Sequence, residues 1–179
     1  MTSLLPLMYL TIVVMVLCIL ALVIFNQIIN KQNIESELYE LQKKTRSKTA
    51  DPSDYYSLGV IYLSKKLYDQ AIIQFSYALK IWEKNDVNGI SNLYNTIGFT
   101  YFESEQYDLS IYYYKQAICK SPNYVVALNN LGYSYEKKKM ILEAIETYKE
   151  ALTYDTDNIT ANEKIDLLTR RFKSRDDRI

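Results

Sequence analysis

Residues 125–158 have the sequence VVALNNLGYSYEKKKMILEAIETYKEALTYDTDN, and this stretch decides the fold of the chain. It holds two amphipathic segments in which apolar residues recur at spacings of three and four, the period of a helix that buries one face. Gly132 in the first segment and Ala144 in the second are small enough to let two helices approach closely. The stretch therefore predicts a pair of packed helices.

The same pattern occurs twice more, in residues 52–85 and 91–124. The glycines that correspond in the three units are Gly59, Gly98 and Gly132, which are 39 and 34 residues apart. Thirty-four residues is the period of the tetratricopeptide repeat, whose signature carries a glycine in the first helix and alanines in the second. We assign the surplus of the first interval to a loop around residues 85–89. The sequence predicts an all-α fold with a three-repeat tetratricopeptide α-solenoid over residues 53–172.

A capping helix is expected over residues 158–172, because a stack of repeats needs a terminal element with a polar outer face. The residues expected on its apolar side are Ile159, Ile165, Leu167 and Leu168. Residues 173–179 are expected to form a frayed tail.

An uncharged apolar stretch runs from Leu4 to Phe25. As a helix its 22 residues span roughly 33 Å, which matches the hydrocarbon core of a bilayer. The alternative is a cleaved secretory signal, which needs a basic start and small residues at its end. No basic residue precedes the stretch, and it closes with Leu22-Val23-Ile24-Phe25. Residues 1–26 are therefore predicted to be an uncleaved transmembrane anchor.

Residues 27–52 are predicted to form a polar juxtamembrane stalk and linker. Lysine and arginine are absent before the span and frequent after it, which places the repeats on the cytoplasmic side or its organellar equivalent. A short apolar row within the stalk, Ile34, Leu38 and Leu41, leaves a second interpretation open, in which this segment dimerises or packs against a partner's membrane helix.

The composition argues against catalysis and against nucleic-acid binding. Basic and acidic residues both number 21, so no bulk charge attracts a polyanion, and histidine is absent. The carboxylate pairs Glu103 with Glu105 and Asp155 with Asp157 fall at expected turns, where acidic residues cap helices. We expect no catalytic residue, no metal site, no cofactor and no small-molecule substrate.

Protein binding is the function that such a scaffold favours, with the first helix of each repeat lining a concave groove. The residues predicted to line it are Tyr56, Val60, Asn92, Asn95, Phe99, Glu103, Val126, Asn129, Tyr133 and Lys137. Aromatic anchors and amides are typical of peptide-binding surfaces. The alternative for each aromatic residue is packing against a neighbouring helix.

Repeats that grip the acidic tails of heat-shock chaperones use a clamp of basic and amide side chains at defined positions. The corresponding residues here are Tyr56, Val60, Thr96, Val126 and Asn130, and none of them is basic. The sequence therefore argues against a receptor for chaperone tails.

Three segments carry a closer resemblance: LGVIYLSKKLY at 58–68, EQYDLSI at 105–111 and YVVALNNLGYSYEKKK at 124–139. Together with the apolar N-terminal span and the short basic stalk, they resemble the small plastid-encoded and cyanobacterial tetratricopeptide-repeat protein needed for photosystem I assembly. The chain departs from the repeat pattern at Ser110, where alanine is usual, and in lacking the terminal proline of the first and third repeats.

The resemblance implies a single-pass thylakoid membrane protein of a plastid or cyanobacterium, with its repeats on the stromal or cytoplasmic side. Its implied partners are photosystem I subunits or other assembly factors. Two other functions stay open: a membrane-tethered receptor for protein insertion, translocation or secretion, and a homo-oligomerising stalk within a larger membrane complex.

Overall fold

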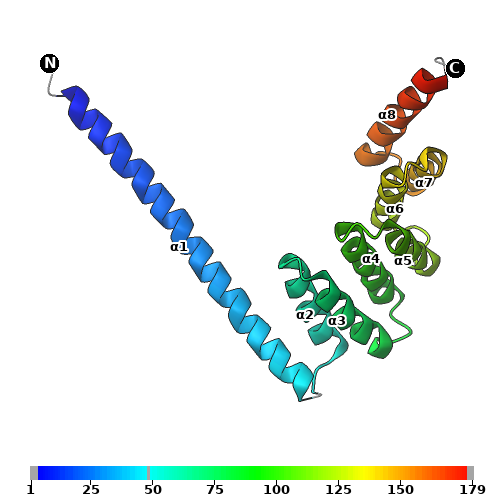
Figure 1. Ribbon diagram of the computed structural model, residues 1–179, viewed down its shortest axis with the longest axis horizontal. Coiled ribbons are helices and arrows are strands. Elements are labelled where there is room, and N and C mark those ends of the chain that lie inside the picture. Colours follow the sequence, from blue (N-terminus) through cyan, green and yellow to red (C-terminus); the bar gives the residue numbers. More distant parts are fainter. Residues whose placement is uncertain (1–3, 48, 177–179) are drawn as a thin grey trace. The chain divides into compact units, whose positions relative to one another are not determined.

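The computed structural model describes residues 4–47 and 49–176, and within them every regular element is a helix (Figure 1). The helices are α1 (Leu4–Arg46), α2 (Pro52–Ser64), α3 (Tyr68–Ile81), α4 (Val87–Glu103), α5 (Tyr107–Lys120), α6 (Val125–Lys137), α7 (Ile141–Tyr154) and α8 (Ile159–Asp176). The chain divides into two compact units, of which the first is α1 and the second holds α2 to α8.

The first unit is one unbroken helix of 43 residues, about 64 Å long at the usual rise. Between Met8 and Phe25 its large apolar side chains are exposed. Among the described helices it alone is long and apolar enough to cross a membrane. The predicted anchor from Leu4 and the predicted stalk as far as Arg46 are therefore successive parts of one helix, with no break between them. Residues 1–3 of the predicted anchor lie outside the described residues.

The second unit is built from three helix pairs, α2 with α3, α4 with α5, and α6 with α7. Each pair packs on the next through α3 with α4 and α5 with α6, and α8 covers α7 at the end of the stack. The predicted three-repeat solenoid and its capping helix are confirmed.

A glycine of the first helix faces an aromatic ring of the second helix in every repeat. The three pairs are Gly59 with Phe75, Gly98 with Tyr114, and Gly132 with Tyr148. A β-carbon added at any of these glycines would lie 2.5–2.8 Å from the nearest ring carbon, so the rings occupy the space that a side chain would need. The glycine signature thus fixes how closely the two helices of a repeat approach.

The link between the first and second repeats differs from the predicted loop. The helix α4 begins at Val87, within the segment expected to be a loop, because Asp86 caps it by accepting a 2.8 Å hydrogen bond from the Gly89 amide. Four of the surplus residues, 87–90, therefore form an additional helical turn that precedes Ser91.

The capping helix α8 reaches Asp176, four residues beyond the predicted end, and thus includes the first part of the predicted tail. Among its residues 159–171 the buried ones are Ala161 and Leu168, with Ile165 half-buried beside them. The prediction that Ile159 and Leu167 lie on the apolar side is wrong, since these side chains are 72% and 41% exposed. The spacing 161, 165 and 168 follows the helical period, and Ile159 precedes the face that this period defines.

We predict that Gly59→Ala lowers the free energy of unfolding by on the order of 1 kcal/mol. Overpacking costs about 1–3 kcal/mol, and the better helix propensity of alanine offsets up to about 1 kcal/mol of it. Urea unfolding of the detergent-solubilised chain, followed by circular dichroism, measures the change. Phe75→Leu removes the opposing ring, so the double variant should lose less stability than the two single variants together. Strictly additive losses would contradict the proposed contact.

Candidate protein-binding surface

The exposed sides of α2, α4 and α6, which we call the A-helix face, carry the predicted binding residues. Val60, Phe99 and Tyr133 occupy the same position in successive repeats and are 39%, 40% and 39% exposed. Val126 is 54% exposed. These four side chains form the apolar part of the A-helix face that is open to a partner.

Tyr56 has a structural role as well as a place in the predicted set. Its hydroxyl lies 3.3 Å from the Thr96 hydroxyl of the next repeat, in a hydrogen bond between α2 and α4. Its ring packs 5.7 Å from that of Phe75 and 6.3 Å from that of Trp82, measured between centroids. Tyr56 therefore packs against neighbouring helices, which is the alternative that the sequence left open for each aromatic residue of the set.

The three predicted asparagines also form hydrogen bonds to side chains outside their own helices. Their bonds are Tyr124 Oη to Asn92 Oδ1 at 3.1 Å, Asn130 Nδ2 to Asn95 Oδ1 at 3.0 Å, and Asn129 Nδ2 to Asn158 Oδ1 at 3.3 Å. Asn95 bonds α6 of the next repeat, whereas Asn92 and Asn129 bond the residues that precede α6 and α8. The Oδ1 atom of Asn129 is buried and has no hydrogen-bond partner among the described residues. The members of the predicted set that are exposed are Val60, Asn92, Phe99, Glu103, Val126, Tyr133 and Lys137.

The two charged members of the predicted set, Glu103 and Lys137, are exposed. The Lys137 ammonium lies 5.3 Å from the centroid of the Tyr133 ring and 6.0 Å from that of Phe102. An ammonium above aromatic rings is attracted by their negative faces, which holds this cation beside the apolar surface.

A carboxylate beside this cation ties the capping helix to the third repeat. Glu136 accepts a 2.6 Å hydrogen bond from the Tyr148 hydroxyl and forms a 3.0 Å ion pair with Lys164 of α8. The Lys164 ammonium in turn lies 4.6 Å from the centroid of the Tyr133 ring. Burial, and then the bond to Glu136, raise the pKa of Tyr148 above its usual value. Tyr148 therefore stays a neutral donor.

Phe102 and Lys164 are not among the residues predicted from the sequence. Phe102 aligns with Glu136 in the repeat, so the outward register that identifies the other positions could have found it. Lys164 lies on α8, outside the repeats, and no periodicity points to it. Only the packing of α8 brings it to Glu136 and Tyr133.

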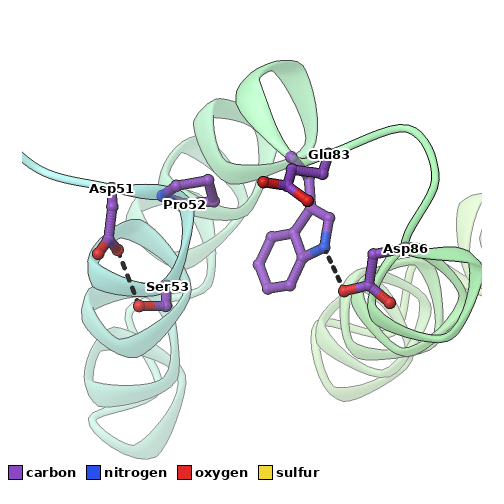
Figure 2. A pocket seen from close by; sticks show the side chains of 6 residues that line it. Asp51, Pro52, Ser53, Glu83 and Asp86 are labelled. Carbon is purple, nitrogen blue, oxygen red and sulfur yellow. Dashed lines mark hydrogen bonds between the residues drawn. The ribbon is translucent and has the colours of Figure 1, made fainter.

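A cavity of about 280 Å³ lies at the joint between the first two repeats, as Figure 2 shows. Its lining residues are Asp51, Pro52, Ser53, Trp82, Glu83 and Asp86. The Trp82 indole donates a 2.9 Å hydrogen bond to Asp86, and Ser53 donates a 2.8 Å bond to Asp51.

The carboxylates of this cavity serve the local structure. Bonds from the Gly89 amide and the Trp82 indole lower the pKa of Asp86. Asp51 accepts a 2.9 Å bond from the Asp54 amide and so caps α2. The polar groups of this cavity therefore stabilise the joint between the first two repeats.

Comparison with known families and structures gives the same fold. Residues 55–84 and 125–158 match the family described as "Tetratricopeptide repeat". Residues 98–139 match the family described as "TPR repeat". A crystal structure of MamA superposes with a TM-score of 0.71 at 20% identity, covering 82% of this chain and 83% of that one. YrrB, described as a TPR protein with an unusual peptide-binding site, superposes with a TM-score of 0.66 at 21% identity, covering 84% and 75%. At these identities the likeness concerns the fold.

Similar sequences cover the N-terminal helix as well as the repeats. The ycf37 protein of Guillardia theta is 48% identical over 179 residues, which is 100% of both chains. The ycf37 protein of Pyropia yezoensis is 36% identical, covering 93% of this chain and 96% of the relative. The chloroplastic tetratricopeptide repeat domain-containing protein PYG7 of Arabidopsis thaliana is 31% identical over 84% of this chain and 50% of its own length.

We predict that Glu136→Ala lowers the free energy of unfolding by about 1.5–3 kcal/mol, the usual contribution of hydrogen bonds to a charged group. The change leaves the Tyr148 hydroxyl and the Lys164 ammonium without their acceptor. Thermal unfolding of the detergent-solubilised chain measures the loss. Asp166→Ala is the matched control, because its pair with Arg170 is exposed and contributes little. Equal unfolding temperatures for the two variants would contradict the role of Glu136.

Proposed function

Because the chain belongs to the ycf37 family of tetratricopeptide-repeat proteins, we propose that it is a membrane-anchored scaffold for photosystem I assembly. It holds photosystem I subunits or their assembly factors at the thylakoid membrane. It acts by binding and not by catalysis.

The observation that carries this proposal is the apolar part of the A-helix face. Val60, Phe99, Val126 and Tyr133 are exposed, whereas Asn95 and Asn129 are half-buried and form hydrogen bonds within the solenoid. Large apolar and aromatic side chains held on a rigid surface are the usual anchors of protein recognition. Rigid helices present them without the entropy loss of ordering a loop on binding.

The proposed anchor is the first part of α1. Its apolar surface is exposed over a length that suits a bilayer, and lysine and arginine follow it. This charge asymmetry favours the stromal side for the repeats. Anchoring raises the effective concentration of a captured subunit at the membrane where it has to be inserted or joined to others.

The photosystem I partner rests on the resemblance of residues 58–68, 105–111 and 124–139 to the assembly-factor family. The name of the Arabidopsis relative assigns that protein to the chloroplast, which is consistent with a thylakoid location for this chain.

The test of the partner is affinity purification of the tagged chain from gently solubilised thylakoids. We expect photosystem I subunits or assembly factors with the unchanged chain. Phe99→Ala/Tyr133→Ala should reduce their recovery at least about tenfold, since each anchor contributes on the order of 2 kcal/mol. Ile73→Ala/Tyr112→Ala is the matched control, because it removes exposed apolar side chains from α3 and α5. Recovery of translocation components alone would favour a receptor, and recovery of the chain alone would favour a homo-oligomer; either result would overturn the proposal.

The test of the anchor is extraction of thylakoid membranes at alkaline pH. The unchanged chain should stay in the membrane fraction, and protease added from the stromal side should digest the repeats. Leu17→Arg/Leu20→Arg should release the chain, because each central charge costs about 2.5–3.5 kcal/mol. Ile34→Arg, in the polar part of α1, is the control that should stay membrane-bound. Release of the unchanged chain would exclude a transmembrane anchor.

A further inference from the structure

We propose that the A-helix face selects an apolar segment of a partner protein that carries one acidic and one basic side chain, which Lys137 and Glu103 bind respectively. This inference rests on the proposed function as a protein-binding scaffold. It adds the chemistry of the bound segment and the direction in which it lies.

The charges near the A-helix face fall into two groups. Glu136 pairs with Lys164, and Lys138 pairs with Asp108, so these side chains stabilise the solenoid itself. Glu103 and Lys137, both exposed, take part in none of the ion pairs that the structure shows among its described residues. Their charges are therefore available to a ligand.

The position of Lys137 strengthens its interaction with an anion. Its ammonium lies above the rings of Phe102 and Tyr133, 6.0 and 5.3 Å from their centroids. Lys164 places a second ammonium 4.6 Å from the Tyr133 centroid, and Glu136 neutralises only one of these two cations. A carboxylate beside Tyr133 would balance the remaining charge next to an apolar ring.

Glu103 and Lys137 are equivalent residues of neighbouring repeats, at the ends of α4 and α6. A direct hydrogen bond between Asn95 and Asn130 joins these two helices. Helices in direct contact lie about 8–10 Å apart, a distance that about three residues of an extended chain cover. A segment with opposite charges about three residues apart therefore fits both side chains in one direction only.

The apolar part of the A-helix face lies next to the two charges. Phe99 and Tyr133 stand one helical turn before Glu103 and Lys137, about 6 Å away along the helix axes. Apolar side chains of the bound segment would cover these rings and supply most of the affinity. The charges would decide the register and direction in which the segment binds.

The experiment is a selection of phage-displayed random 12-residue peptides on the full chain in nanodiscs. The unchanged chain should enrich peptides with an apolar core and an acidic and a basic residue in one fixed order. Glu103→Lys/Lys137→Glu keeps the net charge and should enrich the reversed order. The matched control, Glu146→Lys/Lys149→Glu, changes exposed residues of α7 and should leave the order unchanged. The same order with the Glu103/Lys137 swap, or no enrichment at all, would overturn the inference.

A selected peptide, labelled with fluorescein, then gives dissociation constants by anisotropy. Lys137→Ala should weaken binding about two- to fivefold, as for an exposed ion pair, and added salt should reduce the difference. The charge swap should weaken it about tenfold or more, and a peptide with its two charged residues exchanged should restore the affinity. An affinity that does not respond to any of these changes would exclude the proposed contacts.

Purification from thylakoids separates the two proposals. Undiminished recovery of photosystem I subunits with the charge-swapped chain would overturn the charge selection and leave the scaffold function intact. Failure of the unchanged chain to recover them would overturn the photosystem I function, whatever peptides are selected.

Discussion

The contact between a glycine and an aromatic ring is the constraint on which the solenoid depends. In each repeat the ring of Phe75, Tyr114 or Tyr148 fills the space beside the glycine of the partner helix. The alanines around these rings, such as Ala71 and Ala144, are fully buried, so the two helices meet with no room for larger side chains. Close approach excludes water and lets short helices of 13 to 17 residues bury a continuous core, which none of them could do alone.

Polar bonds between repeats complete this arrangement and also shape the binding surface. Ser110, at a position where alanine is usual, lies 2.8 Å from the Ser134 hydroxyl of the next repeat, and both side chains are buried. On the A-helix face Asn95 accepts a hydrogen bond from Asn130 of the next repeat. Because buried polar groups need partners, these bonds favour one arrangement of neighbouring repeats. The exposed apolar side chains, with the charges of Glu103 and Lys137, are available to bind a partner.

The continuity of α1 gives the proposed anchor a mechanical consequence. A helix of about 64 Å is roughly twice the thickness of a hydrocarbon core, so its polar half continues outward as a regular helix. This polar half would act as a stiff spacer between the bilayer and the linker that leads to the repeats. Tethering of this kind favours capture of a membrane-bound subunit, since the search is confined to the layer beside the bilayer.

The helical class, the three repeats, the capping helix and the outward position of residues such as Phe99 and Tyr133 follow from the amino-acid sequence. Local periodicity and the glycine spacing carry this information, because a repeat contacts mainly its neighbours. Only the tertiary structure decided that Tyr56 and Asn95 hold repeats together, that Ile159 stays exposed, and that Lys164 meets Glu136. These features depend on how one helix is placed against another. That placement follows from packing between side chains distant in sequence, which the helical period of a single segment does not encode.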